Sequence, residues 1–341
     1  MTKLWVDLLN PSHPLFFKPI VDELSKEFDI QITVRPRAET VSLTKQLGLK
    51  ASVLGSFYDE KHMKMAATVN RVITLFTKGP PFDWSISLED SDCVAVSRLK
   101  FKRSILFFDN DLKYRRRNGV IQLAENTVKL LANHIIVPKA TVSVFAETNL
   151  RKKVHSFDGY KEDVYLADFK PNPSVKDQIP FDRYVVIRPE ASQSFYVHDG
   201  TSLVPVLLSY FEGYGIPVVY LPRAKEDADL AAGYEVFIPK KPLNGLDLCY
   251  YSDAVLTGSG TMAREAACMG KPAVSFFPGD ELLSVDKQLI KDGKMIHSRD
   301  VMEIGEYVLA NQGKKTSTSF RRSQQVKKEV LQIIKDILSK Y

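Results

Sequence analysis

The stretch that decides the fold is Val255-Leu-Thr-Gly-Ser-Gly-Thr-Met-Ala-Arg-Glu-Ala-Ala-Cys-Met-Gly-Lys-Pro-Ala-Val-Ser-Phe-Phe277. The apolar run 254–256 predicts a buried strand, and the small residues 257–261 predict a turn. Good helix formers from Met262 to Met269 predict a helix, which Gly270 and Pro272 end. A second strand is expected at 273–277. A strand–turn–helix–strand unit of this kind builds parallel sheets.

The same alternation extends along the whole chain. In the first half, strands are expected at 4–9, 30–34, 51–54, 84–87, 105–108 and 134–137, with helices at 15–28, 41–47, 61–77, 93–99, 121–131 and 140–148. The second half should place strands at 184–187, 218–221, 235–238, 254–256, 273–277 and 295–297, with a helix at 202–214. This pattern predicts an α/β protein with two doubly wound, Rossmann-like parallel-sheet domains.

Three prolines in residues 168–180 interrupt the alternation and are typical of an interdomain linker. We therefore expect an N-terminal domain at 1–167, a linker at 168–180 and a second domain at 181–316. Residues 317–341 should form a C-terminal helix with one apolar stripe. In two facing open sheets, ligands bind in the cleft at the carboxyl ends of the strands, so the residues after each strand are the site candidates.

Composition excludes several classes of protein. A hydrophobic fraction of 44% and a charged fraction of 26% are typical of a globular chain, and no apolar run is long enough to span a membrane. The N-terminus lacks the features of a signal peptide. The scattered Cys93, Cys249 and Cys268 suit neither disulfides nor a metal site. We expect a cytoplasmic protein.

The net charge of +6 includes basic clusters at 113–117 and 321–322. These clusters are either solvated faces or surfaces for a polyanion or an anionic membrane, so peripheral membrane attachment stays an open alternative. No nucleic-acid-binding motif accompanies them, and nucleic acid is not an expected partner.

The turn before Met262 is suited to an anion. Gly258, Ser259, Gly260 and Thr261 carry small side chains, and the first amides of a helix bind phosphate well. Glu265 lies four residues further on, ~6 Å along the helix axis, where its carboxylate would reach an attached ribose. The alternative is a tight strand–helix turn with a solvated or Arg-paired Glu265.

Basic residues follow the neighbouring strands of the second domain. Arg188 and Arg223 stand at two strand ends, where together they would form a cationic pocket for a diphosphate. Each alone is also compatible with an ordinary ion pair. Ser192 follows in the loop after Arg188, and Asp280 with Glu281 would offer carboxylates to sugar hydroxyls. These residues complete the predicted binding site.

Candidate catalytic residues follow strands of the first domain. His13 opens a helix after Asn10-Pro11-Ser12 and is placed to take a proton from an acceptor hydroxyl, or it is an incidental residue of a capping loop. Asp109 and Asp111 form an Asp-x-Asp pattern that some sugar-transferring enzymes use to hold a metal. The alternatives are that these two acids line the cleft or have a purely structural role. The predicted site contains no metal.

These residues together resemble the GT-B glycosyltransferase superfamily. The Thr-Gly-Ser-Gly-Thr-x-x-x-Glu-Ala stretch with Gly270-Lys271-Pro272 is similar to the nucleotide-sugar site of UDP-N-acetylglucosamine 2-epimerases and related transferases. Residues 6–13, 159–162 and 187–190 resemble a mainly archaeal family of predicted glycosyltransferases. The loop 10–13 has no Arg where the epimerases carry a basic residue, which argues more against epimerisation than against sugar binding.

The resemblance implies that residues 259–261 hold the diphosphate and Glu265 the ribose, with Arg188 and Arg223 assisting and His13 facing the sugar. We expect metal-independent transfer of a sugar from a nucleotide diphosphate, with UDP as the expected nucleotide, to an acceptor on the first domain. The nucleotide sugar is substrate, and no cofactor is expected. The acceptor is open and includes polyanionic or membrane-lipid-linked molecules, and oligomerisation is also open.

Three alternatives to the transferase hypothesis are kept. The first is an epimerase or hydrolase of the same donor. The second is a dinucleotide oxidoreductase, because residues 258–263 fit G-x-G-x-x-A and Asp280 follows about 20 residues later. The third is a non-catalytic nucleotide-sugar-binding protein, since a fold does not establish activity.

Overall fold

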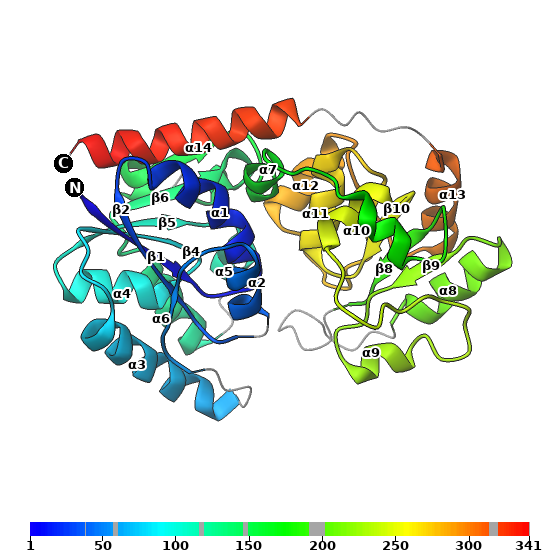
Figure 1. Ribbon diagram of the computed structural model, residues 1–341, viewed down its shortest axis with the longest axis horizontal. Helices are drawn as coiled ribbons and strands as arrows, with labels where there is room; N and C mark the ends of the chain where they lie inside the picture. Colours follow the sequence, from blue (N-terminus) through cyan, green and yellow to red (C-terminus); the bar gives the residue numbers. More distant parts are fainter. Residues whose placement is uncertain are drawn as a thin grey trace. The chain divides into compact units, whose positions relative to one another are not determined.

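The chain folds into two compact α/β units. Unit 1 comprises Met1–Asp168 and Ser323–Tyr341, and unit 2 comprises Phe169–Arg322. The computed structural model describes residues 1–37, 39–56, 61–115, 119–145, 149–190, 202–313 and 320–340. Each unit carries its own parallel sheet with helices on both faces, which confirms the predicted fold class (Figure 1).

Unit 1 is built on a seven-stranded parallel sheet in the order β3-β2-β1-β4-β5-β6-β7. Its strands are β1 (Lys3–Leu8), β2 (Asp29–Val34), β3 (Ser52–Val53), β4 (Trp84–Leu88), β5 (Arg103–Phe107), β6 (His134–Pro138) and β7 (Val154–Phe157). The interior strand β1 is buried from Leu4 to Leu8, which accounts for its almost unbroken apolar sequence. The sequence analysis missed β7, because four residues are too few to show a period.

Helices connect these strands. They are α1 (Ser12–Leu24), α2 (Thr40–Gln46), α3 (Lys61–Lys78), α4 (Ser91–Leu99), α5 (Asp111–Arg115), α6 (Val120–Lys129) and α7 (Lys161–Leu166), with the 3₁₀ segments η1 (Lys139–Phe145) and η2 (Asn149–Lys153). The α-helix expected at 140–148 is therefore wrong over its described part. Its β-branched residues Thr141, Val142 and Val144 have low helix propensity, which favours the short 3₁₀ segment.

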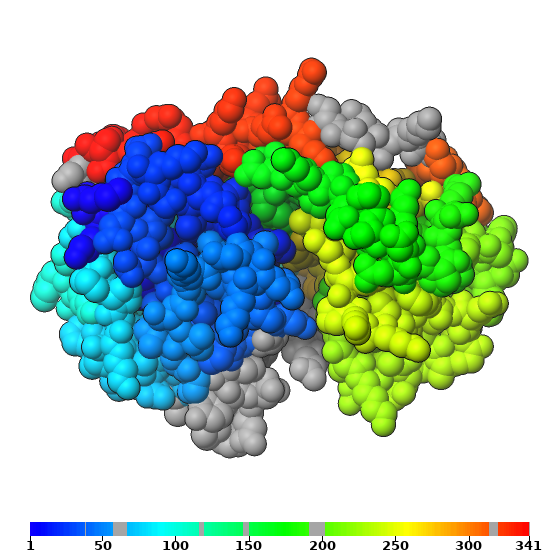
Figure 2. Space-filling view, viewed as in Figure 1, coloured from blue at the N-terminus to red at the C-terminus, as the bar shows by residue number. Residues whose placement is uncertain are grey.

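The last helix, α14 (Arg321–Ser339), belongs to unit 1. Its predicted stripe is confirmed, because Val326, Val330, Ile334 and Ile337 are buried. Polar contacts fasten both halves of the helix: Ser323 donates to Asp163 (2.8 Å), and Lys335 pairs with Glu27 (2.6 Å). In the space-filling view the red helix lies along the blue N-terminal segment (Figure 2).

Unit 2 carries a five-stranded parallel sheet in the order β12-β11-β10-β8-β9. Its strands are β8 (Val185–Arg188), β9 (Val218–Tyr220), β10 (Ala254–Thr257), β11 (Ala273–Ser275) and β12 (Ile296–His297). The strand expected at 235–238 is wrong. Only Phe237 pairs, with Val219 of β9, and Pro239 follows almost at once and cannot donate to a ladder.

The helical segments of unit 2 are η3 (Pro173–Gln178), α8 (Val204–Gly213), α9 (Lys225–Asp229), α10 (Gly245–Tyr251), α11 (Gly260–Met269), α12 (Ser284–Lys291) and α13 (Val301–Asn311). The residues 173–178, expected within a linker, thus form a 3₁₀ segment of unit 2. Among all described helices of the chain, none is both long and apolar enough to cross a bilayer.

The docking of α14 is testable at Gly159, which packs directly beneath it. A Cβ at residue 159 would lie 2.4 Å and 2.7 Å from the two methyl carbons of Val326. Gly159→Ala should therefore destabilise the protein by ~1–3 kcal/mol through overpacking. Thermal unfolding followed by circular dichroism measures the change.

Gly213→Ala is the matched control. Gly213 is the last residue of α8 and a Cβ there would meet no atom within 4 Å, so this variant should be neutral or slightly stabilising. Equal melting temperatures for the two variants would contradict the close contact between Gly159 and α14.

Candidate functional site

The turn between β10 and α11 is shaped by the side chain of Thr257. Its Oγ1 accepts from the Ser259 amide (2.9 Å) and lies 3.0 Å from the Ser259 carbonyl oxygen. Ser259 is the N-cap of α11, but its side chain makes no hydrogen bond to the first turn of that helix. No capping side chain therefore occupies the amides that begin α11, and they keep their capacity to bind an anion.

The two glycines of this turn were expected to leave room for a ligand, but protein atoms lie next to both of them. A Cβ at Gly258 would lie 2.5–2.7 Å from atoms of Glu190, and one at Gly260 would lie 2.3 Å from Nη1 of Arg264. Both positions require glycine because neighbouring protein atoms leave no space for a side chain. Gly258 is buried, whereas Ser259, Gly260 and Thr261 are half-buried. The part of the turn open to a ligand is therefore 259–261.

Arg264 fixes the start of α11 from inside the protein. Its guanidinium is buried and pairs with Asp286 of α12 (3.0 Å), and it also donates to the Thr261 hydroxyl (3.3 Å). Sequence reasoning did not assign a role to this pair, because Asp286 is 22 residues away in the chain. The effect is to hold the helix N-terminus in one orientation relative to the sheet.

Two arginines stand beside this turn at the carboxyl edge of the sheet. Strand register places Arg188 directly opposite Thr257, and β9, which leads to Arg223, flanks the other side of β8. Arg223 donates to the Pro189 carbonyl (3.2 Å). Partial desolvation, and then the like charge of Arg188, lower the pKa of Arg223 to about 10. The sequence prediction that the two cations lie close together agrees with this geometry.

Within the described ranges, no carboxylate lies within ion-pair distance of the Arg188 or Arg223 guanidinium, and the Arg188 side chain makes no hydrogen bond. Two neighbouring cations without an anion repel one another, and a bound dianion would relieve that repulsion.

Glu190 is a residue of this edge that sequence reasoning missed. Its buried carboxylate accepts from the Ser202 hydroxyl (2.7 Å), the Leu203 amide (3.0 Å) and Arg299 Nη1 (3.2 Å). It thereby ties the end of β8 to the start of α8 and to the loop after β12. The available signal was an acidic residue two positions after Arg188 in a strand-end loop.

The remaining predicted binding residues of unit 2 are dispersed. Glu265 is 7% exposed and lies in the buried face of α11, so it does not present an open carboxylate. Asp280 is exposed, and Glu281 pairs with Lys287 (3.5 Å). Ser192 lies outside the described residues. The ribose and sugar roles of this group stay predictions.

In unit 1, His13 occupies the first turn of α1 and is buried. Its Nδ1 accepts from the Leu9 amide (3.1 Å), and its Nε2 lies 3.3 Å from Asn10 Nδ2. Burial, followed by the positive charge of Lys161, lowers the pKa of His13 to about 3. Burial therefore keeps His13 neutral near pH 7. The general-base role expected from the sequence stays a prediction.

Asp109 and Asp111 do not form a joint ligand pair. Asp109 pairs with Lys161 (2.6 Å), and Asp111 pairs with Arg115 (2.6 Å) on α5. Asp111 is fully buried, so its carboxylate cannot touch a substrate in this arrangement. No cluster of three or more metal-ligating side chains occurs in the described part of the chain.

The loops that carry these residues are held by Glu89, which follows β4. Its carboxylate accepts from the amides of Asp109 (3.1 Å) and Asn110 (2.9 Å) and from Lys129 (2.9 Å). Glu89 has φ 54°, a left-handed conformation that is unfavourable for a residue with a side chain. The three hydrogen bonds offset this strain and fix the loop at the edge of the sheet.

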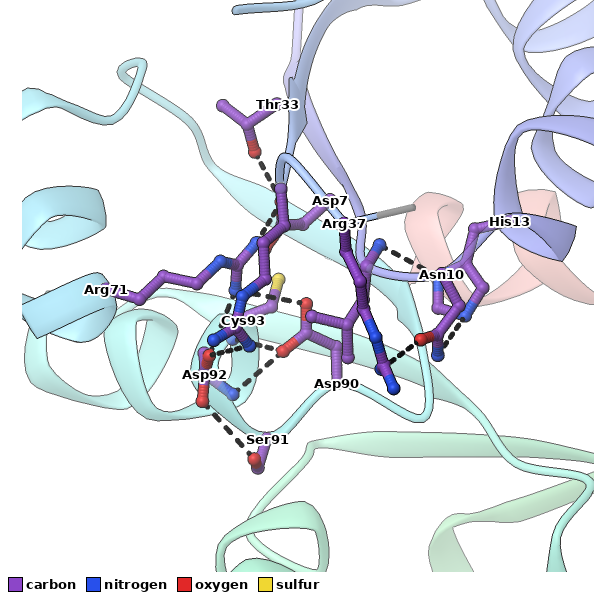
Figure 3. Close-up of polar contacts among 12 residues, drawn as sticks. Asp7, Asn10, His13, Thr33, Arg37, Arg71, Asp90, Ser91, Asp92 and Cys93 are labelled. Atoms are coloured by element: carbon purple, nitrogen blue, oxygen red, sulfur yellow. Dashed lines mark hydrogen bonds and ion pairs between the residues drawn. The ribbon is translucent and has the colours of Figure 1, made fainter. Parts of the chain in front are cut away.

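A second feature missed from the sequence is a buried charge network next to Glu89 (Figure 3). Arg71 of α3 is fully buried, and its Nη2 donates to both carboxylate oxygens of Asp7 of β1 (2.7 and 2.9 Å). It also bonds Asp92 (3.1 Å) and lies 3.6 Å from Asp90. Burial disfavours its charge, but the three carboxylates outweigh burial and raise the pKa of Arg71.

Asp90 differs from the other acids of the network because only one of its two carboxyl oxygens is hydrogen-bonded among the described residues. Its Oδ1 caps α4 by accepting from the Asp92 and Cys93 amides, whereas its buried Oδ2 has no hydrogen-bond partner within the described residues. Burial, and then the charge of Asp7, raise the pKa of Asp90 to about 7. A carboxyl group of this kind exchanges a proton near neutral pH.

This network predicts a pH dependence of stability. Folded Asp90 keeps its proton up to about pH 7, whereas the unfolded chain releases it near pH 4. Folding therefore binds a proton in this window, and the free energy of unfolding falls as pH rises. Because Asp90→Asn cannot ionise and keeps the cap, its stability relative to the wild type should increase from pH 4 to pH 8, as measured by urea denaturation.

Asp300→Asn is the control for this comparison. Asp300 caps α13 in the same way, by accepting from the Met302 and Glu303 amides, but it is exposed. The difference in stability between Asp300→Asn and the wild type should not increase from pH 4 to pH 8. A pH-independent difference for Asp90→Asn would contradict a retained proton at Asp90.

Comparison with solved structures identifies the architecture. The UDP-GlcNAc 2-epimerase of Methanocaldococcus jannaschii, in complex with UDP-GlcNAc and UDP, is 14% identical with a TM-score of 0.72, and the alignment covers all of both chains. A UDP-N-acetylglucosamine 2-epimerase from Rickettsia bellii is 13% identical with a TM-score of 0.73, covering 98% of this chain and 96% of that one. The glycotransferase of kitacinnamycin is 9% identical with a TM-score of 0.58, covering 98% of both chains. The GT-B resemblance is thereby confirmed for the fold.

Comparison of sequences identifies the family. "Uncharacterized protein MJ0665" of Methanocaldococcus jannaschii is 26% identical over 328 residues, which are 92% of each chain. The family model described as "Protein of unknown function (DUF354)" matches residues 2–336. Because that match extends over nearly the whole chain, the protein belongs to the DUF354 family.

Proposed function

We propose that this protein binds a nucleoside diphosphate sugar on unit 2 and transfers the sugar to an acceptor bound by unit 1. The observation that carries the proposal is the pair Arg188 and Arg223, which lie near each other at the carboxyl edge of the sheet. No described carboxylate is within ion-pair distance of either guanidinium. The amides of residues 260–261, which the N-cap side chain leaves free, begin α11 at the same edge. These donors match the charge and the geometry of a diphosphate.

The comparisons support UDP as the nucleotide. The Methanocaldococcus jannaschii epimerase, which is similar in fold, is in complex with UDP-GlcNAc and UDP. In the proposed complex, Arg188 and Arg223 bind the diphosphate oxygens and stabilise the negative charge that develops when the sugar leaves. Arg264 and Glu190 position the turn and the loop after β8 without touching the ligand.

On unit 1, we keep His13 and Asp109 as the candidates for contact with the acceptor. Asp90 titrates near neutral pH, but like Asp111 it is fully buried, so its carboxylate does not touch an acceptor in this arrangement. His13, whose Nε2 lies 3.3 Å from Asn10 Nδ2, is the residue that the sequence predicts to face the sugar. Asp109 is the second candidate, as the partner of Lys161.

Epimerisation or hydrolysis of the same donor is the second candidate. It is favoured by the epimerases of similar fold. The three reactions give different products from UDP-GlcNAc. An epimerase changes the sugar at C2, a hydrolase releases UDP at once, and a transferase leaves the donor intact until an acceptor is added.

Calorimetric titration with UDP tests the binding site. Arg188→Ala and Arg223→Ala should each raise the Kd by ~10-fold or more, because each removes a charge-assisted hydrogen-bond donor. Arg183→Ala is the matched control, since Arg183 pairs with Asp253 and precedes β8 at the opposite edge of the sheet. Its Kd should equal that of the wild type.

The proposal fails if the wild type binds no nucleoside diphosphate or diphosphate sugar. It also fails if the three arginine variants weaken UDP equally, because binding would then reflect net charge and not a built site.

A further inference from the structure

Unit 1 exposes an unusual number of apolar side chains on one helical layer. Fifteen large apolar residues are exposed in the described chain, and nine of these lie on α3, α4, α6 and the turns that follow them. Helix α4 packs against both α3 and α6, so these elements form one layer. The nine residues are Val69, Ile73, Phe76, Leu99, Phe101, Val120, Ile121, Leu123 and Leu131.

Helix α3 has two apolar faces. Ala67, Arg71 and Leu75 point into unit 1, and Val69, Ile73 and Phe76 recur at i, i+4 and i+7 on the solvent side. Between residues 68 and 77 the sole charged residue is Arg71, which is buried. A helix that only contacts water carries charges on its outer face, so this stripe is suited to a contact outside the unit.

The turn after α4 presents a strained and fully exposed aromatic ring. The Phe101 amide donates to the Arg98 carbonyl and the Lys102 amide to the Ser97 carbonyl, a helix-ending arrangement that usually has glycine at the left-handed position. Phe101 takes that position with φ 55° and is 97% exposed. Neither the strain nor the exposure benefits the fold of unit 1.

Cations surround these apolar groups. The turn reads Arg98-Leu-Lys-Phe-Lys-Arg103, with four cations and no acid. Lys100 Nζ lies 5.4 Å from the Phe76 ring centroid, so this turn and the outer face of α3 form one surface. Among described residues from 67 to 103, Asp83 is the sole exposed acid, and it pairs with Lys102. Because β5 begins at Arg103, the turn lies at the amino edge of the sheet, opposite His13 and Asp90.

We propose that this surface, formed by Val69, Ile73, Phe76, Leu99, Phe101 and the cations of residues 98–103, docks on an anionic phospholipid membrane. The apolar tip enters the headgroup region while the flanking lysines and arginines bind lipid phosphates. A second copy of the chain suits the surface less well. A symmetric contact through the turn would place the same cations against each other.

Vesicle co-sedimentation of the full chain tests the proposal. The wild type should bind vesicles of phosphatidylcholine with 30% phosphatidylglycerol and not pure phosphatidylcholine, and high salt should weaken the binding. Lys100→Gln and Lys102→Gln should each weaken binding by about fivefold. The assay contains no sugar nucleotide, so its result is independent of the proposed function.

Phe101→Gly separates docking from folding. Glycine relieves the left-handed strain, so the melting temperature should rise or stay unchanged while vesicle binding falls severalfold. The control is Met302→Ser and not Met302→Gly, because Met302 lies in a helix that glycine would weaken. Met302 is an exposed apolar residue of α13 in unit 2, and its variant should bind vesicles like the wild type.

Two results would overturn the proposal. One is equal binding of the wild type to anionic and neutral vesicles, or none to either. The other is a dimer in size-exclusion chromatography with light scattering that Phe101→Gly converts to a monomer while vesicle binding is unchanged, which would assign the surface to a second copy.

Discussion

Unbalanced positive charge at the carboxyl edge of the second sheet is the constraint on which the functional interpretation depends. Arg188 and Arg223 lie close enough for the charge of one to lower the pKa of the other, and no described carboxylate pairs with either. The nearby carboxylate of Glu190 is already engaged by Ser202, Leu203 and Arg299. A bound anion would relieve the repulsion between the two arginines, and the amides that begin α11 would also bind one.

The first unit shows the opposite arrangement, with a surplus of buried acid. Arg71 faces Asp7, Asp90 and Asp92, and burial makes it costly for all three acids to ionise. The retained proton on Asp90 reduces that cost. This compensation explains how a buried carboxyl oxygen persists without a hydrogen-bond partner in the described structure. It also places a proton-exchanging group at the edge that carries His13 and Asp109.

The sequence was sufficient for features that depend on local pattern. The alternation of apolar runs and helix formers predicted most strands, and the residues after those strands included Arg188, Arg223 and His13. Features that depend on contacts between distant residues could not be obtained in this way. Glu190 with Arg299, and Arg71 with Asp7, are separated by 109 and 64 residues. The pKa of His13 likewise depends on Lys161, which belongs to α7.

The glycines of the turn illustrate a second limit of sequence reasoning. Gly258 and Gly260 suggested room for a ligand, but the structure fills that room with Glu190 and Arg264. A glycine in such a turn indicates that another group approaches the backbone closely. The sequence alone does not say whether that group belongs to a ligand or to the protein. The half-buried residues 259–261 are the part of the turn that stays available.

A crystal structure of the protein soaked with UDP tests the central claim most directly. The expected result is a diphosphate within hydrogen-bond distance of the amides of residues 260–261 and of the Arg188 and Arg223 guanidinium groups. A diphosphate bound elsewhere, with Arg188 and Arg223 unchanged and without a ligand, would contradict the claim.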